Sequence, residues 1–108
     1  MNSERFNKVV KECIDSIESV LVKKAAEYSR NDDRLHNFRV AGRLKDETPE
    51  KALIGMKVKH TVSIGDIVND LDNGILPTKE LLSEKIGDEI NYLILLKALV
   101  IERIEDFK

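Results

Sequence analysis

The apolar residues of this chain recur every three or four positions over three long stretches, which is the spacing of amphipathic helices. In residues 3–29 charged side chains fill the positions between the apolar ones, which are Phe6, Val9, Val10, Cys13, Ile14, Ile17, Val20 and Leu21. A polar run over residues 29–33 ends this pattern. Residues 34–44 then predict a short helix or an ordered loop.

The starts of two further helices are marked by capping residues. Thr48 is followed by Pro49, which combines a capping hydroxyl with a proline at the first helical position. This helix is predicted to end near Leu71, shortly before Gly74. Thr78 caps the last helix, which is predicted to run for about thirty residues, or roughly 45 Å.

The last predicted helix is apolar around much of its circumference, at Ile90, Leu93, Ile94, Leu96, Leu99, Val100 and Ile101. Such a helix requires neighbours on several sides. We therefore predict an all-α fold in which residues 1–108 form one domain. The domain is a helical bundle of three long helices plus a short helix or ordered loop, completed by assembly into a homodimer or homotetramer.

Composition excludes several classes of partner. The 108 residues are 42% hydrophobic and 35% charged, with a net charge of −2, so there is no electrostatic basis for direct binding of nucleic acid. The single cysteine, Cys13, excludes an internal disulfide and fits a reducing compartment. The longest apolar run, residues 92–96, is too short to cross a membrane, and the N-terminus does not resemble a signal peptide. We expect a cytoplasmic protein.

A polar stripe interrupts the apolar last helix. Glu84, Asp88 and Asn91 are spaced so that they share a face with Tyr92 and Leu99. Carboxylates in an apolar setting are costly unless they are paired, protonated or bound to a cation. The stripe predicts a polar pocket that opens off the helical core, and a divalent metal is its simplest occupant.

Oxygen ligands from several helices support this hypothesis. Glu27, Glu84 and Asp88, with Asp66 as an auxiliary ligand, form the predicted metal set, and the first three are also the predicted catalytic residues. Hard oxygen ligands without clustered histidine or cysteine favour Mg²⁺ or Mn²⁺. Lysines nearby, of which Lys59 is the leading candidate, can contact phosphate. Carboxylate-bound metal together with lysine is the set of groups that phosphoanhydride hydrolysis needs.

Further candidate substrate-binding residues have simpler structural explanations, which stay open at this point. Lys23 is also explained by a surface ion pair, and His60 by a place in the interior or at its rim. Asn37 or Asn91 is suited to read the polar edge of a base, and Phe38 or Tyr28 to stack on it. The alternatives are a turn cap for Asn37 and core packing for Phe38. Tyr92 is expected to be a core aromatic whose hydroxyl reaches the pocket.

The segment from Glu84 to Leu96 resembles the second metal-binding helix of the all-α, MazG-like nucleotide pyrophosphohydrolases. The chain also resembles their short phage-encoded relatives of the nucleotide-modification-associated type. In these, a segment like Lys23–Tyr28 precedes an Asn-Phe pair, here Asn37-Phe38, and a middle helix carries a pattern like Met56–His60. The resemblance spans residues 23–96 and implies a dimeric or tetrameric, Mg²⁺-dependent enzyme that cleaves nucleoside triphosphates to the monophosphate and pyrophosphate.

Both acidic motifs depart from the family pattern. Lys23 and Lys24 stand where the enzymes have paired glutamates, so Glu27 is the one acid left in the first motif. Lys85 replaces the second acid of the second motif. A noncatalytic helical oligomer is therefore the alternative. It would bind a nucleotide or a protein partner, or hold Glu84 and Asp88 in structural ion pairs with Lys59 and Lys23.

Overall fold

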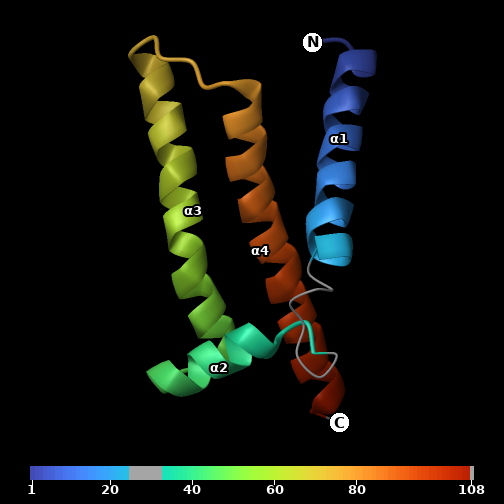
Figure 1. The fold of residues 1–108 in the computed structure, drawn as a ribbon, viewed down its shortest axis with the longest axis vertical. Coiled ribbons are helices and arrows are strands. Elements are labelled where there is room, and N and C mark those ends of the chain that lie inside the picture. Colours follow the sequence, from blue (N-terminus) through green and yellow to red (C-terminus); the bar gives the residue numbers. More distant parts are fainter. Residues whose placement is uncertain (25–32, 108) are drawn as a thin grey trace.

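Helices make up nearly all of the computed structural model, which describes residues 1–24 and 33–107. The elements are α1 (Ser3–Ile17), a π-helical turn η1 (Glu18–Lys24), α2 (His36–Lys45), α3 (Pro49–Asp72) and α4 (Lys79–Asp106), as Figure 1 shows. The predicted all-α class is confirmed. Among the described residues no helix combines the length and the apolar character that a membrane span requires.

The predicted capping residues begin the helices as expected. The Thr48 hydroxyl accepts a hydrogen bond from the Lys51 amide at 3.2 Å, and the Thr78 hydroxyl accepts one from the Leu81 amide at 3.0 Å. Residues 34–44, for which a short helix or an ordered loop is predicted, form the helix α2 from His36 to Lys45. Asp46 follows it in the left-handed region, with φ of 55°. Local sequence therefore determines these boundaries.

The predicted first helix is confirmed as a regular α-helix only as far as Ile17. From Glu18 to Lys24 the chain continues as the wider π-helical turn η1. The end of the predicted helix, residues 25–29, lies outside the described residues, and so does the predicted metal ligand Glu27.

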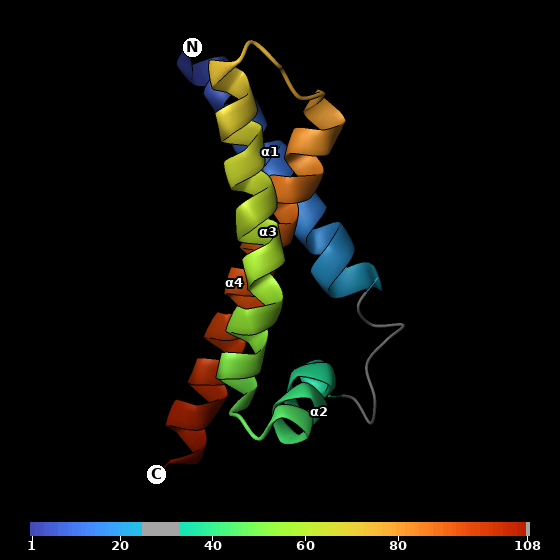
Figure 2. The same cartoon turned by 90° about the vertical axis from the view of Figure 1, so that its left-hand side faces the viewer.

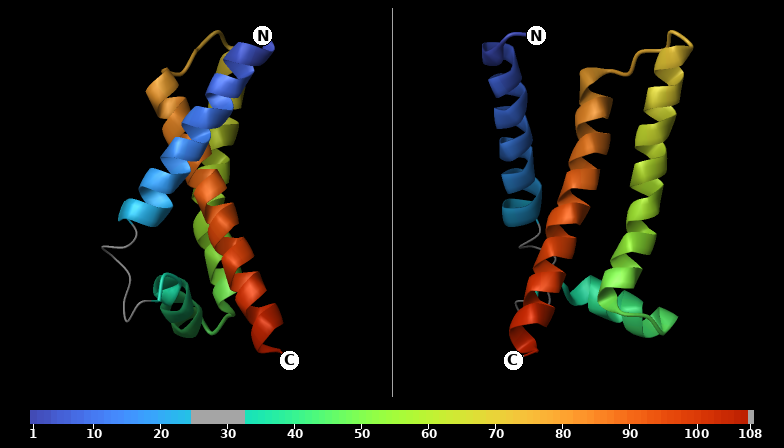
Figure 3. Two further views of the ribbon diagram at one scale, coloured as in Figure 1. Left: turned by 90° about the vertical axis from the view of Figure 1, so that its right-hand side faces the viewer. Right: turned by 180° about the vertical axis from the view of Figure 1, so that it is seen from behind.

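An antiparallel hairpin of α3 and α4 forms the centre of the molecule, and α2 packs across one end of it (Figure 1). Figure 2 shows that α2 lies on one side of this hairpin. The buried core lies where the three helices meet and consists of Leu35, Phe38, Ala52, Leu53 and Leu99. Helix α1 runs beside the first half of α4, in the same direction along the molecule (Figure 3).

Ion pairs of two arginines hold the helices together around this core. Arg39 of α2 lies 2.8 Å from the Asp33 carboxylate and 2.6 Å from that of Glu102 on α4. Arg103 of α4 binds both carboxylate oxygens of Glu50 on α3, at 2.9 and 2.8 Å. Two-point contacts of this kind fix orientation as well as distance. The ion pairs therefore tie α2 and α3 to the end of α4.

The turn between α2 and α3 has no room for a side chain at Gly42. A Cβ there would lie 2.8 Å from the Glu47 carbonyl oxygen and 3.1 Å from the backbone of Pro49. We predict that Gly42→Ala lowers the free energy of unfolding by about 1–3 kcal/mol, because backbone must move to relieve the clash. Urea denaturation followed by circular dichroism measures this change.

The matched control is Gly55→Ala. The atom nearest to its added Cβ is the end of the Lys45 side chain, at 4.0 Å. Alanine replaces glycine within α3, so the free energy of unfolding should rise by up to about 1 kcal/mol. Equal effects of the two substitutions would contradict the described turn.

Candidate functional site

A histidine and a carboxylate face each other between the two long helices. His60 Nδ1 of α3 lies 3.6 Å from Asp88 Oδ2 of α4. The His60 side chain is 16% exposed and that of Asp88 is 38% exposed, so the pair lies at the rim of the core. A carboxylate in this position can orient the imidazole ring.

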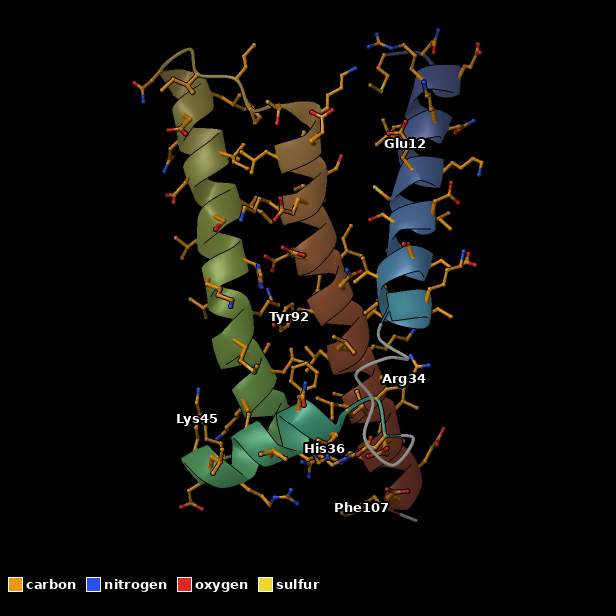
Figure 4. All side chains as sticks on the ribbon, viewed as in Figure 1. Glu12, Arg34, His36, Lys45, Tyr92 and Phe107 are labelled. Atoms are coloured by element: carbon orange, nitrogen blue, oxygen red, sulfur yellow. The ribbon has the colours of Figure 1, made fainter. Side chains whose placement is uncertain are left out.

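Tyr92 connects this pair to the core. Its ring centroid lies 4.9 Å from that of His60, and 6.1 Å from that of Phe38, which it meets edge-on. Figure 4 shows Tyr92 in the space between α3 and α4. Burial, and then the nearby Asp88 carboxylate, raise the pKa of the Tyr92 hydroxyl. The hydroxyl therefore stays protonated at neutral pH and can donate a hydrogen bond.

Asn91 is the most deeply buried polar side chain among the described residues, at 6% exposure. Its Oδ1 atom finds no hydrogen-bond partner among them. A buried acceptor without a partner destabilises a fold by about 1–3 kcal/mol. A bound donor or cation would remove this cost. We call His60, Asp88, Asn91 and Tyr92 the α3–α4 polar cluster.

A second ion pair joins the hairpin beside the cluster. Lys57 of α3 pairs with Glu89 of α4, and the side chains of both are 17% exposed. The Thr61 hydroxyl donates to the same carboxylate, at 2.9 Å from Oε1 and 3.0 Å from Oε2. The hydrogen bond from Lys57 is the main reason that the pKa of Glu89 lies below its ordinary value. Sequence reasoning missed this pair because no spacing rule relates positions on different helices.

The structure brings together some of the predicted site residues and separates others. His60, Asp88 and Tyr92 meet, and Asn91 follows Asp88 by one helical turn. Glu84, one turn before Asp88, is exposed. The predicted substrate contacts Lys23, Asn37 and Lys59 are also exposed, and the predicted interior residue Phe38 is buried at 7% exposure.

Only part of the predicted metal set lies in the residues that the structure describes. Asp66 is exposed and lies about 120° around α3 from His60, so it does not join Asp88. Within residues 1–24 and 33–107, no three acidic, histidine or cysteine side chains are arranged to hold a metal ion. Glu27 lies outside these ranges. A metal held by Glu27, Glu84 and Asp88 therefore stays a prediction.

Comparisons of the chain with protein-family models, with curated proteins and with solved structures found no match. Its function is therefore inferred from the residues of the α3–α4 polar cluster.

The effect of the Asp88 charge on Tyr92 can be tested by titration. Asp88→Asn removes the negative charge, so the pKa of Tyr92 should fall but stay above its ordinary value, because burial is the larger cause of the shift. Ultraviolet absorbance of tyrosinate reports this pKa in a Tyr28→Phe background, where Tyr92 is the sole tyrosine. Glu84→Gln is the control, since Glu84 is exposed. An unchanged Tyr92 pKa in Asp88→Asn would contradict this electrostatic effect.

Proposed function

We propose that the chain binds a nucleotide, or a related phosphorylated small molecule, at the α3–α4 polar cluster and acts as a metal-dependent pyrophosphohydrolase-like protein. The observation that carries the proposal is the buried Asn91 oxygen, which has no hydrogen-bond partner among the described residues and lies one turn from Asp88. A protein gains stability when a ligand satisfies such an atom. The resemblance to the MazG-like enzymes, phage or prophage relatives included, supports the nucleotide as that ligand.

Mg²⁺ or Mn²⁺ is the proposed cofactor. Asp88 and Glu84 lie one turn apart on α4, and the Asn91 side chain adds an amide oxygen. These oxygens are ligands that hard divalent cations prefer, and Glu27 completes the proposed set. When bound, the metal would neutralise charge on the phosphates and lower the pKa of the attacking water.

The residues of the cluster have distinct proposed roles. His60, oriented by the Asp88 carboxylate, is placed to accept or return a proton. Tyr92 keeps its proton at neutral pH and can donate to a phosphate or to the polar edge of a base. Exposed Lys59, which directly precedes His60 on α3, is the proposed contact for a phosphate group.

The second candidate function is that of a noncatalytic helical oligomer. It is favoured by the His60–Asp88 contact, because His60 gives the carboxylate a partner without any metal. In this case Asp88 has a structural role, and the chain binds a nucleotide or a protein partner without cleaving it. Assembly into a homodimer or homotetramer in the cytoplasm is part of both candidates.

Thermal unfolding in the presence of Mg²⁺ or Mn²⁺ and each nucleoside triphosphate tests for the nucleotide binding that the enzyme requires. A ligand at 100 times its dissociation constant stabilises the native state by about 2.7 kcal/mol, which raises the melting temperature of a domain of this size by roughly 10–20 °C. We predict such a rise with one class of nucleotide and only with metal. Release of pyrophosphate from that nucleotide then tests for cleavage.

Two variants and a control connect the shift to the site. Asp88→Asn and Asn91→Leu should both abolish it, and Asn91→Leu should also raise the stability of the ligand-free protein, since the orphaned oxygen is gone. Glu105→Gln changes an exposed carboxylate at the far end of α4 and should leave the shift intact. The absence of a shift with every metal and nucleotide would reject the enzyme in favour of the noncatalytic oligomer.

A further inference from the structure

Two cavities follow each other between α1 and the first half of α4. The larger lies at the N-terminal ends of both helices and has a volume of about 390 Å³, and the smaller lies further along them and has a volume of about 70 Å³. Val9, Glu12 and Ser83 line both cavities. The cavities therefore form one continuous groove, which we call the α1–α4 groove. Figure 4 shows Glu12 on the side of α1 that faces α4.

The mouth of the groove is lined mainly by basic side chains. Arg5 and Lys8 of α1 and Lys79 of α4 line the larger cavity, and Glu12 is the one acid among the described residues that line it. The three basic side chains are exposed, and within residues 1–24 and 33–107 none of them takes part in an ion pair. An anion that enters the groove would therefore meet cations that have no other partner among these residues.

Two further acids lie near the mouth but face elsewhere. Glu4 and Glu80 are each one position away from Arg5 and Lys79, about 100° around their helices. Neither lines the larger cavity. Exposed charges that act through water are screened, whereas lining side chains contact a ligand directly. The basic residues therefore determine which head group the mouth accepts.

The deeper end of the groove is mostly apolar. Ile17 of α1 and Ile86 and Ile90 of α4 are the largest apolar side chains of the smaller cavity, and all three are half-buried. Gly87 leaves room beside them, because a Cβ at this position would lie 3.8 Å from Ser16 Oγ, which is an ordinary contact. The groove therefore changes from charged at its mouth to apolar at its deeper end.

The contact between α1 and α4 lacks a filled interior. No residue of α1 is buried. In the groove, Val9 of α1 is 45% exposed and Leu82 of α4 is 41% exposed. A hydrocarbon chain placed between the two helices would remove apolar surface of both from water and so stabilise their contact.

We propose that the α1–α4 groove binds a single-chain amphiphile with an anionic head, such as a fatty acid or an alkyl phosphate. The head would lie among Arg5, Lys8 and Lys79, and the tail would extend toward Ile17 and Ile90. The larger cavity has the size of small-molecule sites, roughly 300–1,000 Å³. Because the apolar end is small and lies between two helices, it favours one free chain over the surface of a membrane.

This site is separate from the α3–α4 polar cluster. The cluster lies between α3 and α4, whereas the groove lies between α1 and α4. The proposal therefore does not rest on nucleotide binding, and its test uses no nucleotide. Failure of the proposed function would leave it unchanged.

Titration with octanoate and with octyl phosphate, followed by the NMR shifts of backbone amides, tests the site. We expect the shifts to be concentrated in α1 and the first half of α4. From butanoate to octanoate, affinity should rise about fourfold for each methylene that the groove buries. Octanol has the same tail without the charge, so it should bind roughly tenfold more weakly than octanoate.

Charge variants of opposite sign test the mouth. Arg5→Gln together with Lys8→Gln should weaken octanoate binding roughly tenfold, because the head loses two charged donors. Glu12→Gln should strengthen binding, because it removes the acid that lines the groove. The control is Lys11→Gln, which removes an exposed positive charge that pairs with Asp15 at 3.1 Å and does not line the groove. It should leave octanoate binding unchanged.

Gly87→Met tests the apolar end, because its flexible side chain would occupy the smaller cavity. It should weaken octanoate binding more than butanoate binding. If this variant does not fold, the charge variants at exposed positions still decide. The proposal would be overturned by an absence of octanoate binding at millimolar concentrations, by an affinity that does not rise with tail length, or by equal effects of Lys11→Gln and the mouth variant. Binding to phosphatidylglycerol vesicles without binding of octanoate would also overturn it, in favour of a membrane surface.

Discussion

The small core at the crossing of α2, α3 and α4 is the constraint on which the rest of the structure depends. Leu53 of α3 is 0% exposed and Leu99 of α4 is 2% exposed, and both pack with Phe38 of α2. Their packing fixes the register of the antiparallel hairpin, in which α3 residues further along the chain meet progressively earlier α4 residues. Glu50 therefore meets Arg103. His60, further along α3, in turn meets Asp88.

The candidate site follows from this register. His60 and Asp88 come from different helices and meet only because the hairpin is aligned in this way. Tyr92 reaches from the pair to Phe38, so the site is supported by the same core that aligns the helices. The arrangement places the Asp88 carboxylate, the protonated phenol of Tyr92 and the orphaned Asn91 oxygen along one stretch of α4. These groups suit a polar ligand that carries both donors and acceptors.

Local features of the structure could be predicted from the sequence, and pairings between helices could not. Thr48 and Thr78 begin helices because a capping hydroxyl acts on amides three residues away, which a sequence displays directly. The pairing of Lys57 with Glu89 depends on how α3 and α4 align, and periodicity does not contain that alignment. Only chemical type relates Asp66 to Asp88 in the sequence, and the winding of α3 carries Asp66 to another side of that helix. The shared face of Asp88, Asn91 and Tyr92 could be predicted from the sequence, because all three residues lie on the one helix α4.

A core of this size covers little of the apolar surface, so the proposed assembly with further copies of the chain should contribute to the stability of the hairpin. The most direct test is the urea midpoint of unfolding at several protein concentrations. Folding that is coupled to dimer formation follows mass action, so the midpoint should rise steadily as the protein concentration rises. A midpoint that stays constant over a hundredfold range, about 2.7 kcal/mol in mass-action terms, would show that the single chain is stable alone and would contradict the account.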